Sequence, residues 1–182
     1  MLALLISAVA AFASTNLDDL LLLAAWFADR RMRVRHVVIG QYVGIGMLVV
    51  LSALGALAGV ALTLPTRWLG LLPIALGVRR LWQLRQPRDQ KPLPAGQAVG
   101  AVVVMTIANG GDNIAVYMPL LVAQGLAAIP VFALVFGVMT AAWCGIGLAL
   151  VSHPAGRRLI DRYGRKGVPF VLIGIGGYIL AQ

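Results

Sequence analysis

Long apolar stretches, separated by short polar segments, follow one another along the whole chain. A bilayer-spanning helix needs roughly 20 mostly apolar residues, and no segment alternates with the period of barrel strands. Backbone groups that face lipid must be bonded within their own segment, which favours helices. The pattern predicts an all-α integral membrane protein with six transmembrane helices, near residues 2–26, 37–62, 67–83, 97–123, 129–151 and 167–182.

Composition supports the same class of protein. Apolar residues make up 60% of the 182 residues and charged residues 12%, and the mean hydropathy is +0.91. These values lie far from those of an ordinary soluble domain. We therefore expect a single transmembrane domain over residues 1–182, with no separate soluble module.

The positive charge of the chain is confined to alternate loops. The net charge is +9 and the pI is 11.1, and every basic residue except Arg67 lies within residues 30–35, 79–91 or 157–166. By the positive-inside rule these loops are cytoplasmic and both termini lie outside the cell membrane. The charge therefore indicates topology and contact with the lipid bilayer, not nucleic-acid binding. We assign no Lys or Arg to the interior of a predicted span.

A proline-rich polar segment divides the chain into two similar halves. The linker covers about residues 86–96, between repeat 1 at about 1–86 and repeat 2 at about 97–182. In the alignment of the halves, Asp18-Asp19 matches Asp112-Asn113. Because each half has an odd number of spans, the second enters the membrane from the opposite side. The sequence thus predicts two inverted three-helix repeats, as in many secondary transporters.

Each half carries a short acidic motif within a predicted span. Residues three and four apart share a helix face, so each motif presents several oxygen-bearing side chains together. In the fourth span, Gly110-Gly111 and Pro119 provide means of interrupting the helix. Carboxylate, amide and hydroxyl oxygens form a cage suited to a cation. The predicted metal ligands are Thr15, Asn16, Asp18, Asp19, Asn109, Asp112 and Asn113.

The energetic cost of the three acids favours a site over a purely structural role. An Asp at the bilayer centre costs about 2.5–3.5 kcal/mol on insertion scales. The carboxylates must be protonated, solvated in a cavity or paired with a cation from solution. A purely structural role, in which a buried acid bridges neighbouring helices, stays open most clearly for Asp19.

Several segments also carry a resemblance to a known family. They are Phe12 to Leu23 with its Thr-Asn-x-Asp-Asp core, Gly40-Gln41-Tyr42-Val43-Gly44, Gly70-Leu71-Leu72-Pro73-Ile74, Ala108-Asn109-Gly110-Gly111-Asp112-Asn113 and Val168-Pro169-Phe170-Val171-Leu172-Ile173-Gly174. With these motifs, the chain resembles the cadmium resistance transporter family of the lysine-exporter superfamily over nearly its whole length. The resemblance implies a six-helix transporter that exports divalent metal, Cd²⁺ in the named members, with the acidic motifs as the metal site.

The ligand types alone leave the identity of the ion open. Cd²⁺ favours soft sulfur ligands, and Met105 is the one methionine that shares a helix face with the acids of its span. Oxygen ligands serve Mn²⁺, Ca²⁺ or Mg²⁺ as readily. We expect no resident cofactor; the transported ion is Cd²⁺, with Mn²⁺ and Zn²⁺ as alternatives.

We expect transport, with no enzymatic activity, and proton exchange is a natural coupling because protons compete with metal for buried carboxylates. Two other functions stay open. One is export of a cationic amino acid. The other, more remote, is intramembrane aspartyl proteolysis, whose Gly-x-Gly-Asp signature is not met here because the residue at its first position is Asn109. Gln41 and Tyr42 are candidates for the transport pathway. The sequence leaves both a monomer and a homo-oligomer open.

Overall fold

The computed structural model describes residues 1–29, 32–61, 66–83, 99–153 and 165–181, and these residues form helices and no β-strand. Two helices are long and straight enough to define the length of the molecule: α3 (Val34–Ala61) and α7 (Ile129–Ser152), which follows the short turn η2 (Leu126–Ala128). Both are long and apolar enough to cross a membrane. Large apolar side chains on their outer faces, such as Leu54 and Leu134, are more than half exposed. An apolar exterior of this kind suits contact with lipid.

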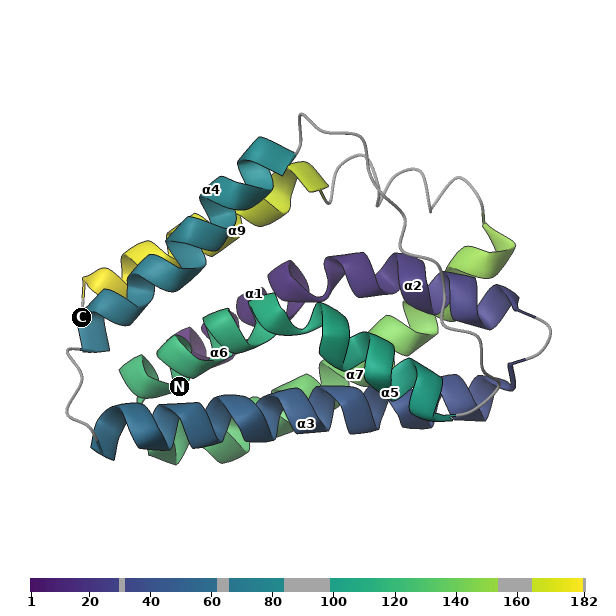
Figure 1. The fold of residues 1–182 in the computed structure, drawn as a ribbon, viewed down its shortest axis with the longest axis horizontal. Coiled ribbons are helices and arrows are strands. Elements are labelled where there is room, and N and C mark those ends of the chain that lie inside the picture. The colour runs from purple at the N-terminus through teal and green to yellow at the C-terminus, as the bar shows by residue number, and fades with distance from the viewer. Residues whose placement is uncertain (30–31, 62–65, 84–98, 154–164, 182) are drawn as a thin grey trace.

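Two further apolar segments are each bent at a single residue. Helices α1 (Leu2–Thr15) and α2 (Leu17–Ala28) meet at 57°, and α5 (Val99–Asn109) and α6 (Gly111–Gln124) meet at 64°. Figure 1 shows both bends near the middle of the molecule. If each bent pair is one span, the described residues hold four helices that could cross a membrane; otherwise they hold two.

The third helices of the two halves pack against each other. After the turn η1 (Thr66–Gly70), α4 (Leu71–Gln83) runs beside α9 (Arg165–Leu180), and the two form an inclined pair in Figure 1. A Cβ on Gly70 would lie 2.5 Å from the carbonyl oxygen of Gly176, and one on Gly176 would lie 2.4 Å from that of Gly70. A Cβ on Gly77 would lie 2.8 Å from the carbonyl oxygen of Pro169. Only glycine allows the two backbones to come this near.

Aromatic side chains fill the core beside the bends. The rings of Tyr117 on α6 and Phe136 on α7 have centroids 4.4 Å apart. Phe12 on α1 lies 5.4 Å from Phe136, and Phe132 lies 5.6 Å from it. Tilted and edge-on ring pairs at these distances add to the stabilisation from burial. This cluster fixes α1, α6 and α7 around the point where the acidic motifs meet.

The described residues contain a helix in each of the six stretches that the hydrophobic pattern predicts, although two to four of these stretches qualify as candidate spans. Pro119 lies inside α6, which continues through it to Gln124, so the expectation that Pro119 interrupts the helix was wrong. Such a proline is tolerated where neighbouring groups compensate for the missing donor, and Pro119 is buried between neighbouring helices. The predicted linker at about 86–96 lies outside the described residues.

Candidate functional site

The first break lies at Asn16, in a run without glycine or proline. Its backbone has φ −103° and ψ 9°, outside the helical region. The side-chain Nδ2 donates to the carbonyl oxygen of Phe12 at 2.9 Å, and the indole Nε1 of Trp143 on α7 donates to the carbonyl oxygen of Asn16 at 2.9 Å. Side chains that bond nearby carbonyls compete with helix hydrogen bonds. The asparagine and its tryptophan partner thus explain why α1 ends here.

The second break lies at Gly110, as the sequence predicts. The freedom of the glycine backbone is not the reason for a glycine at this position. Its φ of −77° and ψ of 11° are open to any residue. A Cβ at this position would lie 2.4 Å from both methyl groups of Leu48, a fully buried side chain of α3. Glycine is therefore required by the close approach of α3 to the bend.

Four buried side chains join the two breaks and are called the hinge network below. Asn113 Nδ2 donates to Asn16 Oδ1 at 3.0 Å, and Asn16 Nδ2 donates to the hydroxyl oxygen of Tyr117 at 2.6 Å. The hydroxyl groups of Thr15 and Tyr117 are 3.0 Å apart. All four residues are at most 4% exposed. The hinge network therefore holds the bend in α1–α2 directly against the bend in α5–α6.

The breaks also place helix ends around the acids. Asp18 and Asp19 lie in the first turn of α2, and Asp112 lies in the first turn of α6. Helix N-termini carry partial positive charge, which stabilises nearby carboxylates. The preceding ends of α1 and α5 leave carbonyl groups without helix partners, and such ends are used as cation ligands in transporters with discontinuous helices.

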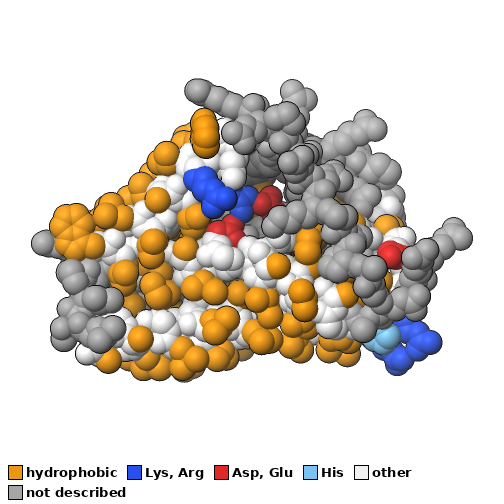
Figure 2. Space-filling view, in the orientation of Figure 1, with side chains coloured by type: hydrophobic (Ala, Val, Ile, Leu, Met, Phe, Trp, Pro, Cys, Tyr) orange, Lys and Arg blue, Asp and Glu red, His pale blue; other side chains and the backbone are white. Residues whose placement is uncertain are grey.

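Arg80 bridges the two broken helices. Its Nη1 donates to Asp18 Oδ2 and its Nη2 donates to Asp112 Oδ2. Asp112 is 11% exposed, Arg80 26% and Asp18 38%. Figure 2 shows acidic and basic side chains side by side near the middle of the molecule, with hydrophobic side chains to the left and below and further charged side chains at the right-hand end. One guanidinium group thus pairs with one acid from each motif and balances one of their two negative charges.

This arrangement corrects the expectation that the acids have no Lys or Arg partner on a helix. Arg80 was assigned to a cytoplasmic loop, whereas α4 continues to Gln83 and carries Arg80 on its last turns. The buried residues of α4 are Pro73 and Gly77, and Arg80 follows Gly77 by three residues. That helical spacing was the available signal, because it places Arg80 on the inward face.

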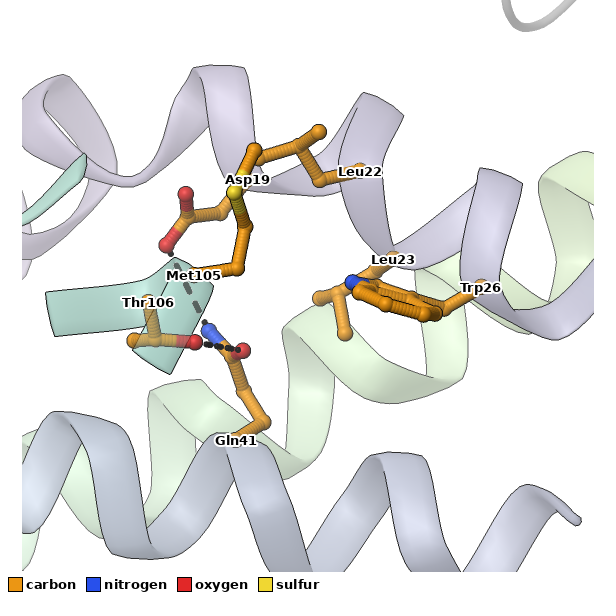
Figure 3. A pocket seen from close by; sticks show the side chains of 7 residues that line it. All are labelled: Asp19, Leu22, Leu23, Trp26, Gln41, Met105 and Thr106. Carbon is orange, nitrogen blue, oxygen red and sulfur yellow. Dashed lines mark hydrogen bonds between the residues drawn. The ribbon is translucent and has the colours of Figure 1, made fainter. Parts of the chain in front are cut away.

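Asp19 has a separate environment from the other two acids. Its only side-chain hydrogen bond in the described residues comes from Gln41 Nε2, at 3.4 Å from Oδ2. Asp19 and Gln41 line a small cavity of about 10 Å³, shown in Figure 3. The remaining lining residues are Leu22, Leu23, Trp26, Met105 and Thr106. A space of this size accommodates about one water molecule.

Gln41 reaches this cavity because α3 packs closely on α5. A Cβ on Gly40 would lie 2.6 Å from Val102, and one on Gly44 would lie 2.7 Å from Thr106. The sequence suggested Gln41 for the transport pathway but did not indicate its hydrogen-bond partner, Asp19. Tyr42 instead donates from its exposed hydroxyl to the carbonyl oxygen of Gly137 at 3.0 Å.

The predicted ligands therefore divide into separate settings. Asp18 and Asp112 meet at Arg80, Asp19 lies at the cavity, and Asn109 is the last residue of α5. Thr15, Asn16 and Asn113 belong to the hinge network. Across the described residues, no group of three or more His, Cys, Asp or Glu side chains is placed to hold a metal ion. Metal binding by the seven residues stays a prediction.

Comparisons with known proteins identify the family. No curated protein and no solved structure gave a significant match. The family model described as cadmium resistance transporter matches residues 12–182, which include both acidic motifs and every described helix apart from the beginning of α1. Together with the apolar helices, this match indicates a membrane transporter. The chain belongs to the cadmium resistance transporter family.

Proposed function

We propose that the protein exports a divalent metal cation, Cd²⁺ first, from the cytoplasm, and that the ion binds between Asp18 and Asp112. The observation that supports this proposal is the shared guanidinium group, which bonds carboxylates from both broken helices. A carboxylate pair that already holds one cation has charge and spacing suited to another. A divalent ion balances two negative charges, whereas Arg80 supplies one positive charge.

The proposed architecture is a single domain of six spans in two inverted repeats. Both breaks lie two residues before aligned aspartates, since Asn16 precedes Asp18 and Gly110 precedes Asp112. Discontinuous helices at matching places in two repeats are typical of transporters that bind their substrate near the bilayer midplane. The pairing of α4 with α9, the third helix of each half, is a further support for this arrangement.

The proposed orientation follows from the basic loops. With these loops in the cytoplasm, both termini lie outside and the protein crosses the cell membrane several times. The proposed partners are the metal ion and the lipid bilayer, without nucleic acid, and a homo-oligomer stays open. Seven of the loop arginines lie outside the described residues: Arg30, Arg31, Arg85, Arg88, Arg157, Arg158 and Arg162.

Neutral ligands would come from the remaining motif residues. In this conformation Thr15, Asn16 and Asn113 bond one another and Tyr117, so they reach an ion only after the hinge network opens. Asn109 and the carbonyl ends of α1 and α5 complete the proposed oxygen set. Rocking of one repeat against the other would open the network and move the site between the two sides of the membrane.

Proton exchange is the proposed coupling. Arg80, a divalent ion and protons can each bind the carboxylate oxygens of Asp18 and Asp112, and these three compete for the same oxygens. Protons taken up after metal release would return the carboxylates to a neutral state without a second metal ion. This cycle exports one divalent ion in exchange for protons.

The proposal is tested by Cd²⁺ uptake into inside-out membrane vesicles. We expect Asp112→Asn to lower the rate by about tenfold or more, because an amide keeps the shape of the site but loses its charge. Asp29→Asn is the matched control, since Asp29 follows the end of α2 away from both breaks, and it should transport like wild type. Unchanged Cd²⁺ uptake by Asp112→Asn would overturn the assignment of the site.

A second candidate function is supported by the guanidinium itself. The group bound between Asp18 and Asp112 is the head group of an arginine side chain, so the same acids suit a cationic amino acid. Competition separates the two substrates. If arginine or lysine in excess abolishes Cd²⁺ uptake and is itself transported, the amino acid is a substrate; if uptake is unaffected, metal export stands alone.

A further inference from the structure

The cavity beside Asp19 combines a buried carboxylate with few competing partners. Asp19 is 7% exposed and, among the residues that the structure describes, accepts one side-chain hydrogen bond, from Gln41 at 3.4 Å. Arg80 bonds Asp18 and Asp112 and leaves Asp19 without an ion pair among the described residues. A buried carboxylate costs several kcal/mol unless a charge or hydrogen bonds compensate it. One long hydrogen bond from an amide is little compensation.

Gln41 and Thr106 hold polar atoms that can turn towards this carboxylate. The Thr106 hydroxyl lies 2.9 Å from Gln41 Oε1 and 2.9 Å from the carbonyl oxygen of Val102. A hydroxyl group has one hydrogen and can donate to only one of these two acceptors. If the Gln41 amide rotates by half a turn, its Nε2 donates to Thr106, Thr106 donates to Val102, and the amide oxygen faces Asp19. A cation between the two facing oxygens would then join them, as would a water molecule or a proton on Asp19.

Met105 adds a soft ligand to the same cavity. It lines the cavity together with Asp19 and Gln41, and Figure 3 shows these side chains directed into one space from α5, α2 and α3. Thioether sulfur favours soft ions, whereas carboxylate and amide oxygens also accept hard ions such as Mn²⁺ and Mg²⁺. The cavity volume of about 10 Å³ leaves room for one ion without its hydration shell.

We infer that this cavity is a second cation site, in which Asp19, Gln41 and Thr106 supply oxygens and Met105 supplies the sulfur that selects Cd²⁺ over hard divalent ions. The inference rests on the proposed function, since it assumes that a divalent cation enters the protein. Asp18 and Asp19 are consecutive, so the second site adjoins the pair bridged by Arg80. A cation can bind at Asp19 while Arg80 stays in place.

The test measures binding of Cd²⁺ and Mn²⁺ to the purified full-length protein in detergent. We expect Met105→Leu to weaken Cd²⁺ binding by about tenfold or more and Mn²⁺ binding by less than about twofold, because leucine keeps the volume and loses the sulfur. Met118→Leu is the matched control. Met118 packs against Gly55 on α3, away from the cavity, and its replacement should change neither affinity. Equal effects of Met105→Leu on both ions would overturn the selectivity assignment.

X-ray absorption at the cadmium edge gives a readout that does not depend on variants folding. Wild-type protein should show sulfur among the Cd²⁺ neighbours, at one sulfur per ion or fewer when the Asp18–Asp112 site is also filled, and a shell of oxygen and nitrogen alone would overturn the inference. The sulfur signal should persist in Met118→Leu and disappear in Met105→Leu. Failure of the proposed function can be distinguished from failure of the second site. If the proposed function fails, Asp112→Asn would leave Cd²⁺ uptake unchanged, whatever the sulfur signal shows.

Discussion

Asp18 and Asp19 are neighbours in sequence, yet the protein compensates their charges in opposite ways. Asp18 shares the guanidinium group of Arg80 with Asp112, whereas Asp19 has one long hydrogen bond from the neutral Gln41. A group on the chain itself must leave before a dissolved cation binds to the first pair. In the part of the chain that the structure describes, no such group occupies Asp19. The difference separates a position that is closed by the protein's own charge from one at which the proposed second cation would meet no competing charge.

Removal of the guanidinium group should break this contrast with the largest effect. We expect Arg80→Gln to lower the free energy of unfolding by about 2–3 kcal/mol, less than the roughly 3–5 kcal/mol for a fully buried pair, because Asp18 is 38% exposed. Thermal unfolding in detergent measures the change. Added Cd²⁺ should stabilise Arg80→Gln more than wild type, since the ion replaces the lost charge. Equal stability of the two proteins without metal would contradict the role of Arg80.

A double-mutant cycle sharpens the contrast between the acids. Asp112→Asn in the Arg80→Gln background should restore about 1–2 kcal/mol, because it removes a carboxylate left without its partner. Asp19→Asn in the same background should show a coupling to Arg80 below about 0.5 kcal/mol, since the two side chains share no hydrogen bond. Denaturant unfolding of the four proteins in each cycle provides the values. Equal coupling for both acids would mean that Arg80 compensates all three together.

The smallest expected effect concerns the neutral partner of Asp19. Gln41→Leu leaves the carboxylate without its hydrogen bond and should cost about 1–2 kcal/mol of unfolding free energy. Gln124→Leu is the control, because the Gln124 amide also bonds one side chain, Tyr178 at 3.0 Å, but on the exposed surface. Its replacement should cost less than about 0.5 kcal/mol. If Gln41→Leu costs no more than this control, Asp19 has another means of compensation.

The sequence predicted the positions of the helices better than the contacts between them. Apolar stretches locate the six helical segments because burial in lipid requires long apolar runs, and Gly110 was a visible weak point in the fourth. The break at Asn16 was not predicted, since it depends on Trp143 from a distant helix. Arg80 was assigned to a loop because its charge was taken as a topology signal. The predicted span at 67–83 already included Arg80, but hydropathy does not show which neighbours the Arg80 face of α4 meets.

The close backbone contact between α4 and α9 has a mechanical consequence for the charge at the breaks. Gly70 and Gly176 lie so close together that a methyl group on either would collide with the carbonyl oxygen of the other. A tilt of α4 therefore also moves α9. Arg80 lies at the far end of α4 from this contact, and a small rotation about the glycines becomes a larger displacement of the guanidinium group. The C-terminal helix is thereby tied to the ionic state of a site to which it contributes no charged side chain among the described residues.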